Sequence, residues 1–548
     1  MQGLALHFQL PSRVRSRLRQ GWAPAGGVLL AAASLLSATS AQAQSFTWVG
    51  TGSTTNTGEY TLGTNWANPP VSAPPIAAGQ SAIFDTTGST TVTVTSGPIA
   101  PDSWTFTANS QSYSISGAAV NFSLAGAGGG IIDNASSGRT ISISNNIGGV
   151  GVQVQLLGNS TLVLSGTNTY SGGTFICSCA SLQLGDATHT ASIVGAVTNF
   201  GTFNIVNANT SGITSITNDL EGGAILPGLT TFFNGTSAGT MAITNKNGGE
   251  TDFGFPFSKD IASAGNAVIV NRVGGLTEFN GMSTAGNANI TNRFGGETDF
   301  YDHSNAGSAT IVNRFAGVTT FNDFSSAMNA SITSRFGGET DFYDHSSAGS
   351  ATITNRFGGS TIFFDHSTAG NATIVNGSFG GPFSTEPVGL GFFDHSSAGT
   401  ATIVNNNNGF IAFGIPFGND TASADHATII NNAGSALEFN AFTTAGNATI
   451  TTNSGGAVAF FDASTGGNAQ FITNGAGYVD FSRSIGPGFD GRITAGSIAG
   501  SGTYYIGAGH TLIVGSNNLS TEVSGVIADF FAAVRPDPAR LKKSAPTR

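Results

Sequence analysis

The amino-acid sequence predicts an all-β fold, a right-handed parallel β-helix (β-solenoid) with rungs of about 21 residues. Three observations predict it. A repeat runs from about residue 231 to 483, the composition is rich in glycine and small polar residues, and apolar and polar types alternate within each repeat. A period in this range is typical of solenoids, in which each unit buries its apolar face only against its neighbours.

The repeat reads roughly F-x-D-x-S-x-A-G-x-A-x-I-x-N-x-x-G-G-x-T-x-F. The phenylalanine that ends each unit recurs mostly every 21 residues, with steps of 26 or 29 where a unit carries an insertion. These phenylalanines are Phe253, Phe279, Phe300, Phe321, Phe342, Phe363, Phe392, Phe413, Phe439, Phe460 and Phe481.

The composition supports an ordered β-protein. Only 9% of the 548 residues are charged, against about 25% in ordinary globular proteins. Glycine-rich polar sequence can signal disorder. Here the β-branched residues and the 40 phenylalanines recur in register, which favours strands with glycine and asparagine at the turns.

Each rung is expected to contain two short strands. Alternation places Ala351, Ile353 and Asn355 on one face of the first strand, and Thr361 and Phe363 on one face of the second. Like residues of successive rungs should then stack about 4.8 Å apart. The expected isoleucine column is Ile243, Ile269, Ile290, Ile311, Ile332, Ile353, Ile374, Ile403, Ile429 and Ile450, followed by Phe471.

A buried asparagine ladder and glycine corners are also predicted. Stacked asparagine side chains can hydrogen-bond to one another along a column. Glycine pairs such as Gly295-Gly296 and Gly358-Gly359 suit tight corners that need a positive φ. The asparagine column is Asn245, Asn271, Asn292, Asn313, Asn355, Asn376, Asn405 and Asn431, interrupted by Ser334.

Residues 1–43 are expected to be a signal peptide, with an N-terminal membrane anchor as the alternative. Arg13, Arg15, Arg17 and Arg19 precede an apolar run, Gly26–Leu36, and a small-residue cleavage site, Ala41–Ala43. The apolar run is too short to span a bilayer. Removal of this segment takes away four arginines and no acids, which leaves 15 basic and 30 acidic residues and a net charge of −15. Such a charge disfavours nucleic acid.

The rest of the chain divides by its sequence pattern. Residues 44–150 form an N-terminal β/capping region, in which Trp48, Trp66 and Trp104 are expected to cover the first rung. Four further segments follow: 151–230, a β-strand repeat region; 231–483, the 21-residue repeats; 484–528, C-terminal solenoid rungs; and 529–548, a basic tail.

Residues 161–176, TLVLSGTNTYSGGTFI, resemble the autotransporter-associated β-strand repeat of bacterial autotransporter passenger domains. FTWVG at Phe46–Gly50 and SIAGSGTYYIG at Ser497–Gly507 also look like parts of such passengers. The resemblance implies an exported, non-enzymatic passenger for surface display or adhesion, at the cell surface, outer membrane or outside the cell. Host or matrix surface glycans or proteins would be its partners, and we expect a monomer.

The family's outer-membrane translocator, a β-barrel, is expected but not encoded in this chain, since only 21 residues follow Ile527. The alternative function is a β-helix polysaccharide-binding or polysaccharide-degrading enzyme, whose acids would perform acid–base catalysis. Because most acids fall in repeat register, we expect no enzyme, no catalytic residue, no cofactor and no metal site.

Several recurring groups are open to both a chemical and a structural interpretation. Asp-His pairs could bind a transition metal or form solvated corners. An arginine column, Arg272, Arg293, Arg314, Arg335 and Arg356, reads as a surface ion-pair face beside acids such as Glu297 and Asp299, or as an anion or carbohydrate site. The Asp-His pairs are Asp302-His303, Asp344-His345, Asp365-His366 and Asp394-His395.

Other motifs are weaker. Gly235–Gly239 matches G-x-S-x-G, which would be a nucleophile elbow only on a strand–turn–helix. Cys177 and Cys179 are expected on the same side of a strand, where a disulfide would be strained and a metal signal is weak. Insertions around Gly254–Ala262, Gly414–Ala422 and Gly377–Gly391 are expected to be surface loops, and are candidates for specific contacts or mere length variation.

Overall fold

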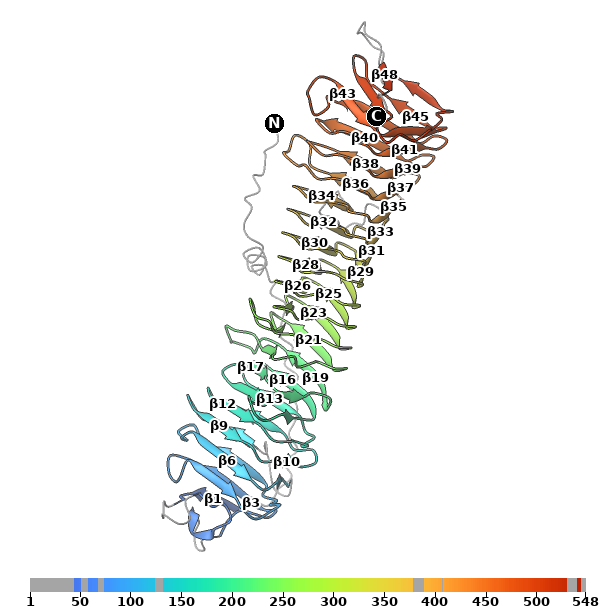
Figure 1. Cartoon of the computed structure of the whole chain (residues 1–548). Coiled ribbons are helices and arrows are strands. Elements are labelled where there is room, and N and C mark those ends of the chain that lie inside the picture. The colour runs from blue at the N-terminus through green and yellow to red at the C-terminus, as the bar shows by residue number, and fades with distance from the viewer. Residues whose placement is uncertain are drawn as a thin grey trace.

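The chain forms a long rod of stacked parallel strands (Figure 1). This computed structural model describes residues 44–50, 58–67, 73–123, 132–377, 389–406, 408–529 and 540–543. The expected signal peptide and most of the basic tail lie outside these residues. Within them, no helix has the length and apolarity needed to cross a bilayer.

Two parallel sheets run the length of the rod, and each contributes one strand to most rungs. We call the first the isoleucine sheet, after the column that it buries. Of the described residues, 21 strands belong to it. They are β1 (Gln44–Trp48), β2 (Trp66–Ala67), β3 (Gln80–Phe84), β5 (Ser103–Phe106), β8 (Ile132–Asn134), β11 (Val154–Leu156), β13 (Thr174–Ile176), β16 (Gly195–Asn199), β19 (Ile213–Asn218), β21 (Ala242–Lys246), β23 (Val268–Arg272), β25 (Asn289–Arg293), β27 (Thr310–Arg314), β29 (Ser331–Arg335), β31 (Thr352–Arg356), β33 (Thr373–Gly377), β35 (Thr402–Asn406), β37 (Thr428–Asn431), β39 (Thr449–Thr452), β41 (Gln470–Thr473) and β44 (Ser497–Gly500).

We call the second the phenylalanine sheet, and its strands also pair in parallel from rung to rung. They are β4 (Thr91–Val94), β6 (Tyr113–Gly117), β9 (Thr140–Ile143), β12 (Thr161–Leu164), β14 (Ser181–Leu184), β17 (Thr202–Ile205), β20 (Leu229–Phe232), β22 (Glu250–Phe253), β24 (Leu276–Phe279), β26 (Glu297–Phe300), β28 (Val318–Phe321), β30 (Glu339–Phe342), β32 (Ser360–Phe363), β34 (Leu390–Phe392), β36 (Phe410–Phe413), β38 (Ala436–Phe439), β40 (Ala457–Asp462), β42 (Tyr478–Ser484), β45 (Thr503–Tyr505) and β47 (Val526–Ala528).

A third side closes each rung with single parallel bridges, which run from Ser237 to Thr465. Buried alanines such as Ala306 and Ala309 line this side, so the chain can approach the two sheets closely. The remaining elements are the 3-10 helix η1 (Gly63–Asn65), the pair β7 (Val120–Asn121) and β10 (Ile147–Gly148), the pair β15 (Ala191–Ser192) and β18 (Ala208–Asn209), and the small sheet of β43 (Arg492–Ala495), β46 (Thr511–Val514) and β48 (Arg540–Lys543).

This architecture confirms the predicted β-solenoid and its apolar columns. Ile290 pairs with Ile269 and Ile311, and all three side chains are at most 1% exposed. The phenylalanine rings from Phe232 to Phe481 stack nearly parallel, with centroids 4.6–4.9 Å apart. Burial of each such side chain contributes roughly 1.5–3 kcal/mol.

The asparagine ladder is confirmed and extends beyond the predicted column. Asn245 donates to Asn271, and Asn271 to Asn292, at 2.9 Å each. Asn199 and Asn218 continue it toward the N-terminus at 2.8 Å, although they precede the 21-residue repeats. Each amide therefore finds both its donor and its acceptor partner in the adjacent rungs.

The two glycines of each corner pair have different roles. Gly295 has a φ of 73°, as predicted. Gly296 has no such φ, and a Cβ there would lie 2.1 Å from the carbonyl oxygen of Asn271 on the preceding rung. The first glycine is thus required by backbone conformation and the second by close approach between rungs.

An aromatic cluster covers the N-terminal end of the rod, as predicted. Trp48, Trp66 and Trp104 are at most 1% exposed and pack around Phe84. The Trp104 Nε1 donates to the Tyr60 hydroxyl at 3.0 Å, so the buried indole is satisfied. These bulky rings fill the terminal space that a further rung would occupy in the stack.

We expect Asn292→Ala to lower the free energy of unfolding by about 2–4 kcal/mol, because each buried polar group left without a partner costs roughly 1–3 kcal/mol. Thr298 Oγ1 would lose its acceptor, and Asn271 Nδ2 would lose one of its three acceptors. Chemical denaturation measures the loss. Asn292→Ser is the matched control, since Ser334 occupies the same column and bonds Thr340 at 2.9 Å. It should lose at most half as much, and equal losses would contradict the ladder's importance.

Candidate functional site

A column of positive charge follows one corner of the rod. We call it the cation ladder, and it consists of the residues that end six consecutive strands of the isoleucine sheet. Direct pairing between these strands places each residue opposite the next. The ladder is Lys246, Arg272, Arg293, Arg314, Arg335 and Arg356.

The prediction that the arginine column forms a surface ion-pair face is wrong. Lys246 pairs with Asp219 at 2.7 Å. Among the residues that the structure describes, none of the five arginines has an ion pair, and the Nε atoms of Arg293, Arg314 and Arg335 are buried without a hydrogen-bond partner. Glu297 and Asp299 follow Arg293 in sequence, but they lie around the corner on the phenylalanine sheet.

The cation ladder therefore places positive charges next to one another, one on each rung. Two unit charges about 4.8 Å apart repel by about 1 kcal/mol in bulk water, and by several times more near a protein surface. Nothing in the described part of the chain compensates the arginines, apart from a cation–π contact of Arg335 with Phe336 at 5.9 Å. The corner is consequently suited to anions from outside.

A second row of aromatic rings runs beside the cation ladder. Phe294, Phe315, Phe336 and Phe357 stack with centroids 5.3–5.4 Å apart and planes within 9° of parallel. Phe294 is 56% exposed. We call this row the phenylalanine ridge. At its N-terminal end a groove of about 460 Å³ lies among Lys246, Asn247, Arg272, Val273, Arg293 and Phe294.

The histidines of the Asp-His pairs stack as an exposed column. His345 lies 5.2 Å from His366, and His366 lies 5.0 Å from His395, with the rings within 8° of parallel. Stacked rings at this distance present their nitrogens side by side rather than converging on one ion, which needs bonds of about 2.0–2.1 Å. In this arrangement the column is a poor metal site.

The aspartates of these pairs, together with Asp323, form a ladder that the sequence did not predict. Asp323 N–H donates to the Asp344 carboxylate at 3.1 Å, and Asp344 N–H donates to Asp365 at 3.2 Å. Each of these aspartates has a φ of 53–55°. The aspartate recurs because it tolerates this left-handed corner and ties one rung to the next.

We expect Asp344→Ala to lower the free energy of unfolding by about 1–3 kcal/mol, because it removes an inter-rung acceptor and places alanine at a left-handed φ. Asp344→Asn should change it by much less, since an amide oxygen still accepts. His345→Ala should cost under about 0.5 kcal/mol, as is usual for exposed positions. Thermal and chemical denaturation measure all three, and a larger loss for His345→Ala than for Asp344→Ala would overturn the assignment.

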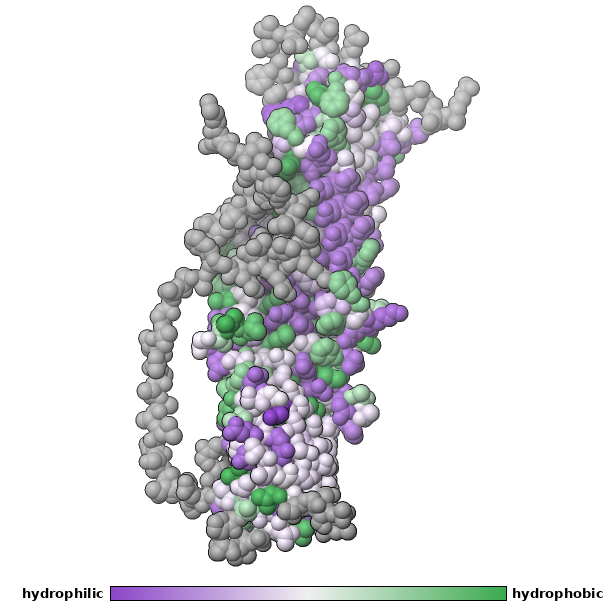
Figure 2. Space-filling model, turned by 90° about the vertical axis from the view of Figure 1, so that its left-hand side faces the viewer, coloured by the Kyte–Doolittle hydropathy of each residue, from purple (hydrophilic) through white to green (hydrophobic). Residues whose placement is uncertain are grey.

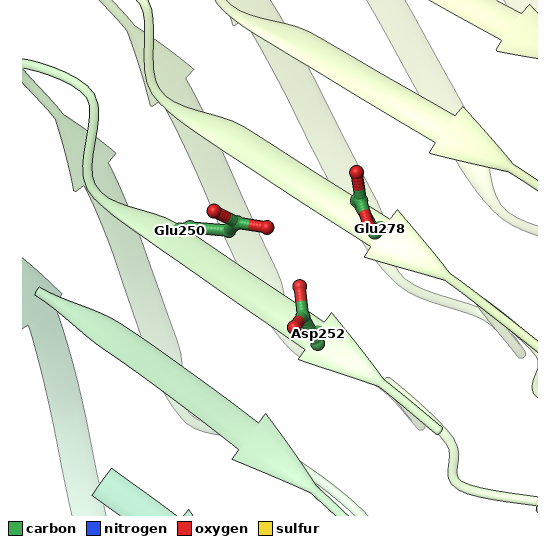
Figure 3. A group of neighbouring side chains, drawn as sticks. All are labelled: Glu250, Asp252 and Glu278. Atoms are coloured by element: carbon green, nitrogen blue, oxygen red, sulfur yellow. The ribbon is translucent and has the colours of Figure 1, made fainter. Parts of the chain in front are cut away.

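Three carboxylates meet on the outer face of the phenylalanine sheet (Figure 3). Glu250 and Asp252 come from β22 and Glu278 from β24, and they bring one oxygen each within 4.8 Å of one another. The cluster could not be predicted from the sequence, because the step from Phe253 to Phe279 is 26 residues rather than 21. The repeat alone therefore does not tell which acids of the two rungs face each other. Such oxygens are the ligand type that Ca²⁺ or Mg²⁺ prefers.

The cluster also changes the protonation of its members. Burial, and then the charges of Glu250 and Glu278, raise the pKa of Asp252 well above its usual value. Burial and Glu297 do the same to the pKa of Asp299 on the next rung, which accepts a hydrogen bond from Thr320 at 2.6 Å. A raised pKa favours the protonated form that a general acid needs, so this face also has groups of the type that acid–base catalysis uses.

We expect Asp252→Asn to raise the free energy of unfolding at pH 7 by roughly 0.5–3 kcal/mol, the usual size of a single-substitution effect, since an amide cannot ionise in this buried, acidic site. A raised folded pKa means that the folded state binds the proton more tightly. The wild-type chain is therefore favoured below the unfolded pKa of about 3.9 and loses stability as pH rises.

The gain of the Asp252→Asn variant should therefore vanish near pH 3.5. Denaturation across this pH range measures it. Asp490→Asn, at an aspartate whose side chain is 53% exposed, is the control and should shift little. A gain that is independent of pH would contradict the origin in charge.

A hollow lies where the 21-residue repeats begin. Its volume is about 900 Å³, and hydroxyl, amide and backbone groups of residues 206–211 and 234–240 line much of it. Ser237 of the G-x-S-x-G match lies here, on a parallel bridge rather than at a strand–helix turn, and its Oγ accepts from Gly239 N–H at 3.1 Å. Hydrogen bonds from Thr188 hold the pKa of the adjacent Asp186 carboxyl below its usual range. Among the described residues, no imidazole or carboxylate bonds the Ser237 hydroxyl, as activation of a serine nucleophile would require.

The two cysteines lie in the turn after β13, not on a strand as predicted. Their Sγ atoms are 3.0 Å apart and both thiols are free. Burial, and then the neighbouring Cys179, raise the pKa of Cys177 to about 11, so its thiol is a poor nucleophile at neutral pH.

Two of the insertions form surface loops between strands, as predicted, and the third falls mostly on residues outside the described ranges. Each described loop exposes a phenylalanine: Phe257 is 79% exposed and Phe417 is 93% exposed. Figure 2 shows one side of the rod, where hydrophilic residues follow one another along the upper half and hydrophobic residues form small separate patches.

Comparison with known proteins finds a distant structural neighbour. No protein-family model matches the chain, and no curated protein matches it. Among solved structures, the chain is similar to the crystal structure of a TibC-catalyzed hyper-glycosylated TibA55-350 fragment, at 12% identity and a TM-score of 0.32. The match covers 67% of this chain and 99% of that one. Likeness at this level places the chain in no family.

Proposed function

We propose that the protein is an exported, non-enzymatic rod of the autotransporter-passenger type, displayed on or released from the bacterial surface for adhesion. The observation that carries the proposal is the repetition of the outer surface. The cation ladder and the phenylalanine ridge present the same groups on successive rungs. A surface of this kind favours extended or repetitive partners such as host or matrix glycans and proteins, bound along its length by a monomer.

The sequence motifs support export. Residues 1–43 have the charge, apolar run and small-residue site of a signal peptide. The segment Thr161–Ile176 has the autotransporter-repeat pattern, and in the structure it spans β12 and β13, one strand of each sheet. An acidic mature chain with few cysteines fits a rod held together by packing and ladders outside the cytoplasm.

A polysaccharide-degrading enzyme is the second candidate, and the carboxylate cluster favours it. Asp252 and Glu278 lie close together, and the raised pKa of Asp252 is what a general acid requires. The cluster nevertheless lies on a sheet face, and its three residues line neither of the two hollows described above. We therefore rank display and adhesion first.

We expect the 231–483 array to be accessible to antibody or protease on intact cells of the encoding bacterium, or to appear in the medium. The recovered protein should begin at Gln44, which mass spectrometry measures. Deletion of the gene should reduce attachment to host or matrix surfaces, and complementation with Asp252→Asn should restore it. An array retained inside the cell with residues 1–43 attached would overturn the proposal. Sugar release that the Asp252→Asn variant abolishes would establish the enzyme instead.

A further inference from the structure

The cation ladder has a regular geometry that indicates its ligand. We propose that the ladder and the phenylalanine ridge together bind an extended anionic polysaccharide that carries one carboxylate on each sugar residue. This inference rests on the proposed surface-binding function and names the class of ligand. It is argued from charge, spacing and shape.

Charge is the first argument. Within the described residues, the five arginines have no carboxylate partner, and three of them bury an Nε without an acceptor. The mature chain is otherwise strongly acidic, with 30 acidic residues against 15 basic ones. A polyanion would supply the missing counter-charges at one corner, while the acids on the phenylalanine sheet keep it from the neighbouring face.

Spacing is the second argument. The ladder residues pair one to one across consecutive rungs, from Lys246 to Arg356. Rungs repeat about every 4.8 Å, which is close to the length of one pyranose residue in an extended chain. A polyuronate along the rod axis therefore keeps step with the ladder, so that each carboxylate on the side facing the rod can meet a cation. Guanidinium groups bind carboxylates in a planar, two-pronged geometry that lysine does not offer.

Shape is the third argument. The phenylalanine ridge runs parallel to the ladder over the rungs of Phe294, Phe315 and Phe336. Its rings are exposed at Phe294 and half-buried at Phe315 and Phe336, and they form an apolar strip against which the C–H edge of a sugar chain can pack. The groove at the N-terminal end, between Arg272 and Phe294, has both kinds of group on its walls. A ligand with a charged edge and an apolar edge fits this arrangement.

Nucleic acid fits less well. The phosphates of a duplex strand follow one another about every 3.4 Å along the axis, which falls out of step with the rungs. The net charge of the whole chain also repels a long nucleic acid. A single-stranded oligonucleotide is therefore a comparison ligand in the test.

The experiment measures binding of the full chain, as recovered from the exporting cell, to polygalacturonate by isothermal titration calorimetry. Fully methyl-esterified polygalacturonate is the matched neutral ligand. The triple variant Arg293→Gln/Arg314→Gln/Arg335→Gln should weaken binding at least tenfold. Arg139→Gln/Arg483→Gln/Arg492→Gln removes the same charge elsewhere and should leave affinity within twofold.

Chain length and competitors sharpen the test. Affinity for galacturonate oligomers should rise with length and level off near six residues, the number of cations in the ladder. Equal binding of the esterified polymer, equal binding by the two triple variants, or equal affinity for a single-stranded oligonucleotide of the same charge would each overturn the inference. Melting temperatures check folding, and the ladder variant should melt no lower than wild type because it loses repulsion.

Surface exposure of the 231–483 array is measured on the same cells. Exposure without polygalacturonate binding would refute the ligand assignment alone. An array that binds polygalacturonate in solution but stays inside the cell would refute the proposed display and leave the binding site standing.

Discussion

The constraint on which this structure depends is that each side chain lies about 4.8 Å from its own counterpart on the next rung. Interior columns are therefore limited to residues whose side chains can stack on, or hydrogen-bond to, the identical side chain of the next rung. Phenylalanine does so by stacking, with centroids 4.7 Å apart between Phe300 and Phe321. Asparagine does so because its amide both donates and accepts, as in the bond of Asn292 to Asn313 at 2.9 Å. Burial of many such contacts offsets the entropy cost of ordering the rungs.

Identical charged side chains repel one another in such a column. The structure treats this repulsion differently at three places. The aspartate ladder alternates carboxylate with backbone N–H, so Asp344 bonds Asp323 rather than repelling it. At the carboxylate cluster, burial and the charges of Glu250 and Glu278 raise the pKa of Asp252, which favours its neutral form and so reduces repulsion. Neither of these arrangements is found for the arginines from Arg272 to Arg356. A group that the fold leaves uncompensated while it satisfies its neighbours is the natural place to look for a ligand.

The interior residues could be predicted from the sequence because each inward-facing residue recurs at the same position of the repeat. Ile353, Asn355 and Phe363 recur at fixed steps, and alternation alone assigns them to the inside. The outside could not be predicted so well. Arg293 and Glu297 are four residues apart, yet a corner separates them onto different faces. Asn199 and Asn218 join the ladder from outside the 21-residue period, so no repeat marks them. Alternation predicts a strand through Cys177 and Cys179, but β13 ends at Ile176 and a turn follows it.

The insertions show the same constraint at work on the loops. In the rung after each described insertion, the aspartate column has a different residue, Gly281 or Ala441, and the next rung restores it as Asp302 or Asp462. The loop N–H of Phe257 reaches Asp302 at 2.9 Å, across 45 positions, and that of Phe417 reaches Asp462 at the same distance.

Both loops are thus held on the aspartate ladder by the same kind of hydrogen bond, from a phenylalanine N–H to an aspartate carboxylate. The two insertions share the pattern G-x-P-F-x-x-D-x-A, this bond and a left-handed phenylalanine with φ of 58° and 59°, so they are one repeated feature rather than variation in length. Because the ladder anchors each loop, its exposed ring is presented at a fixed place on the same corner of the rod.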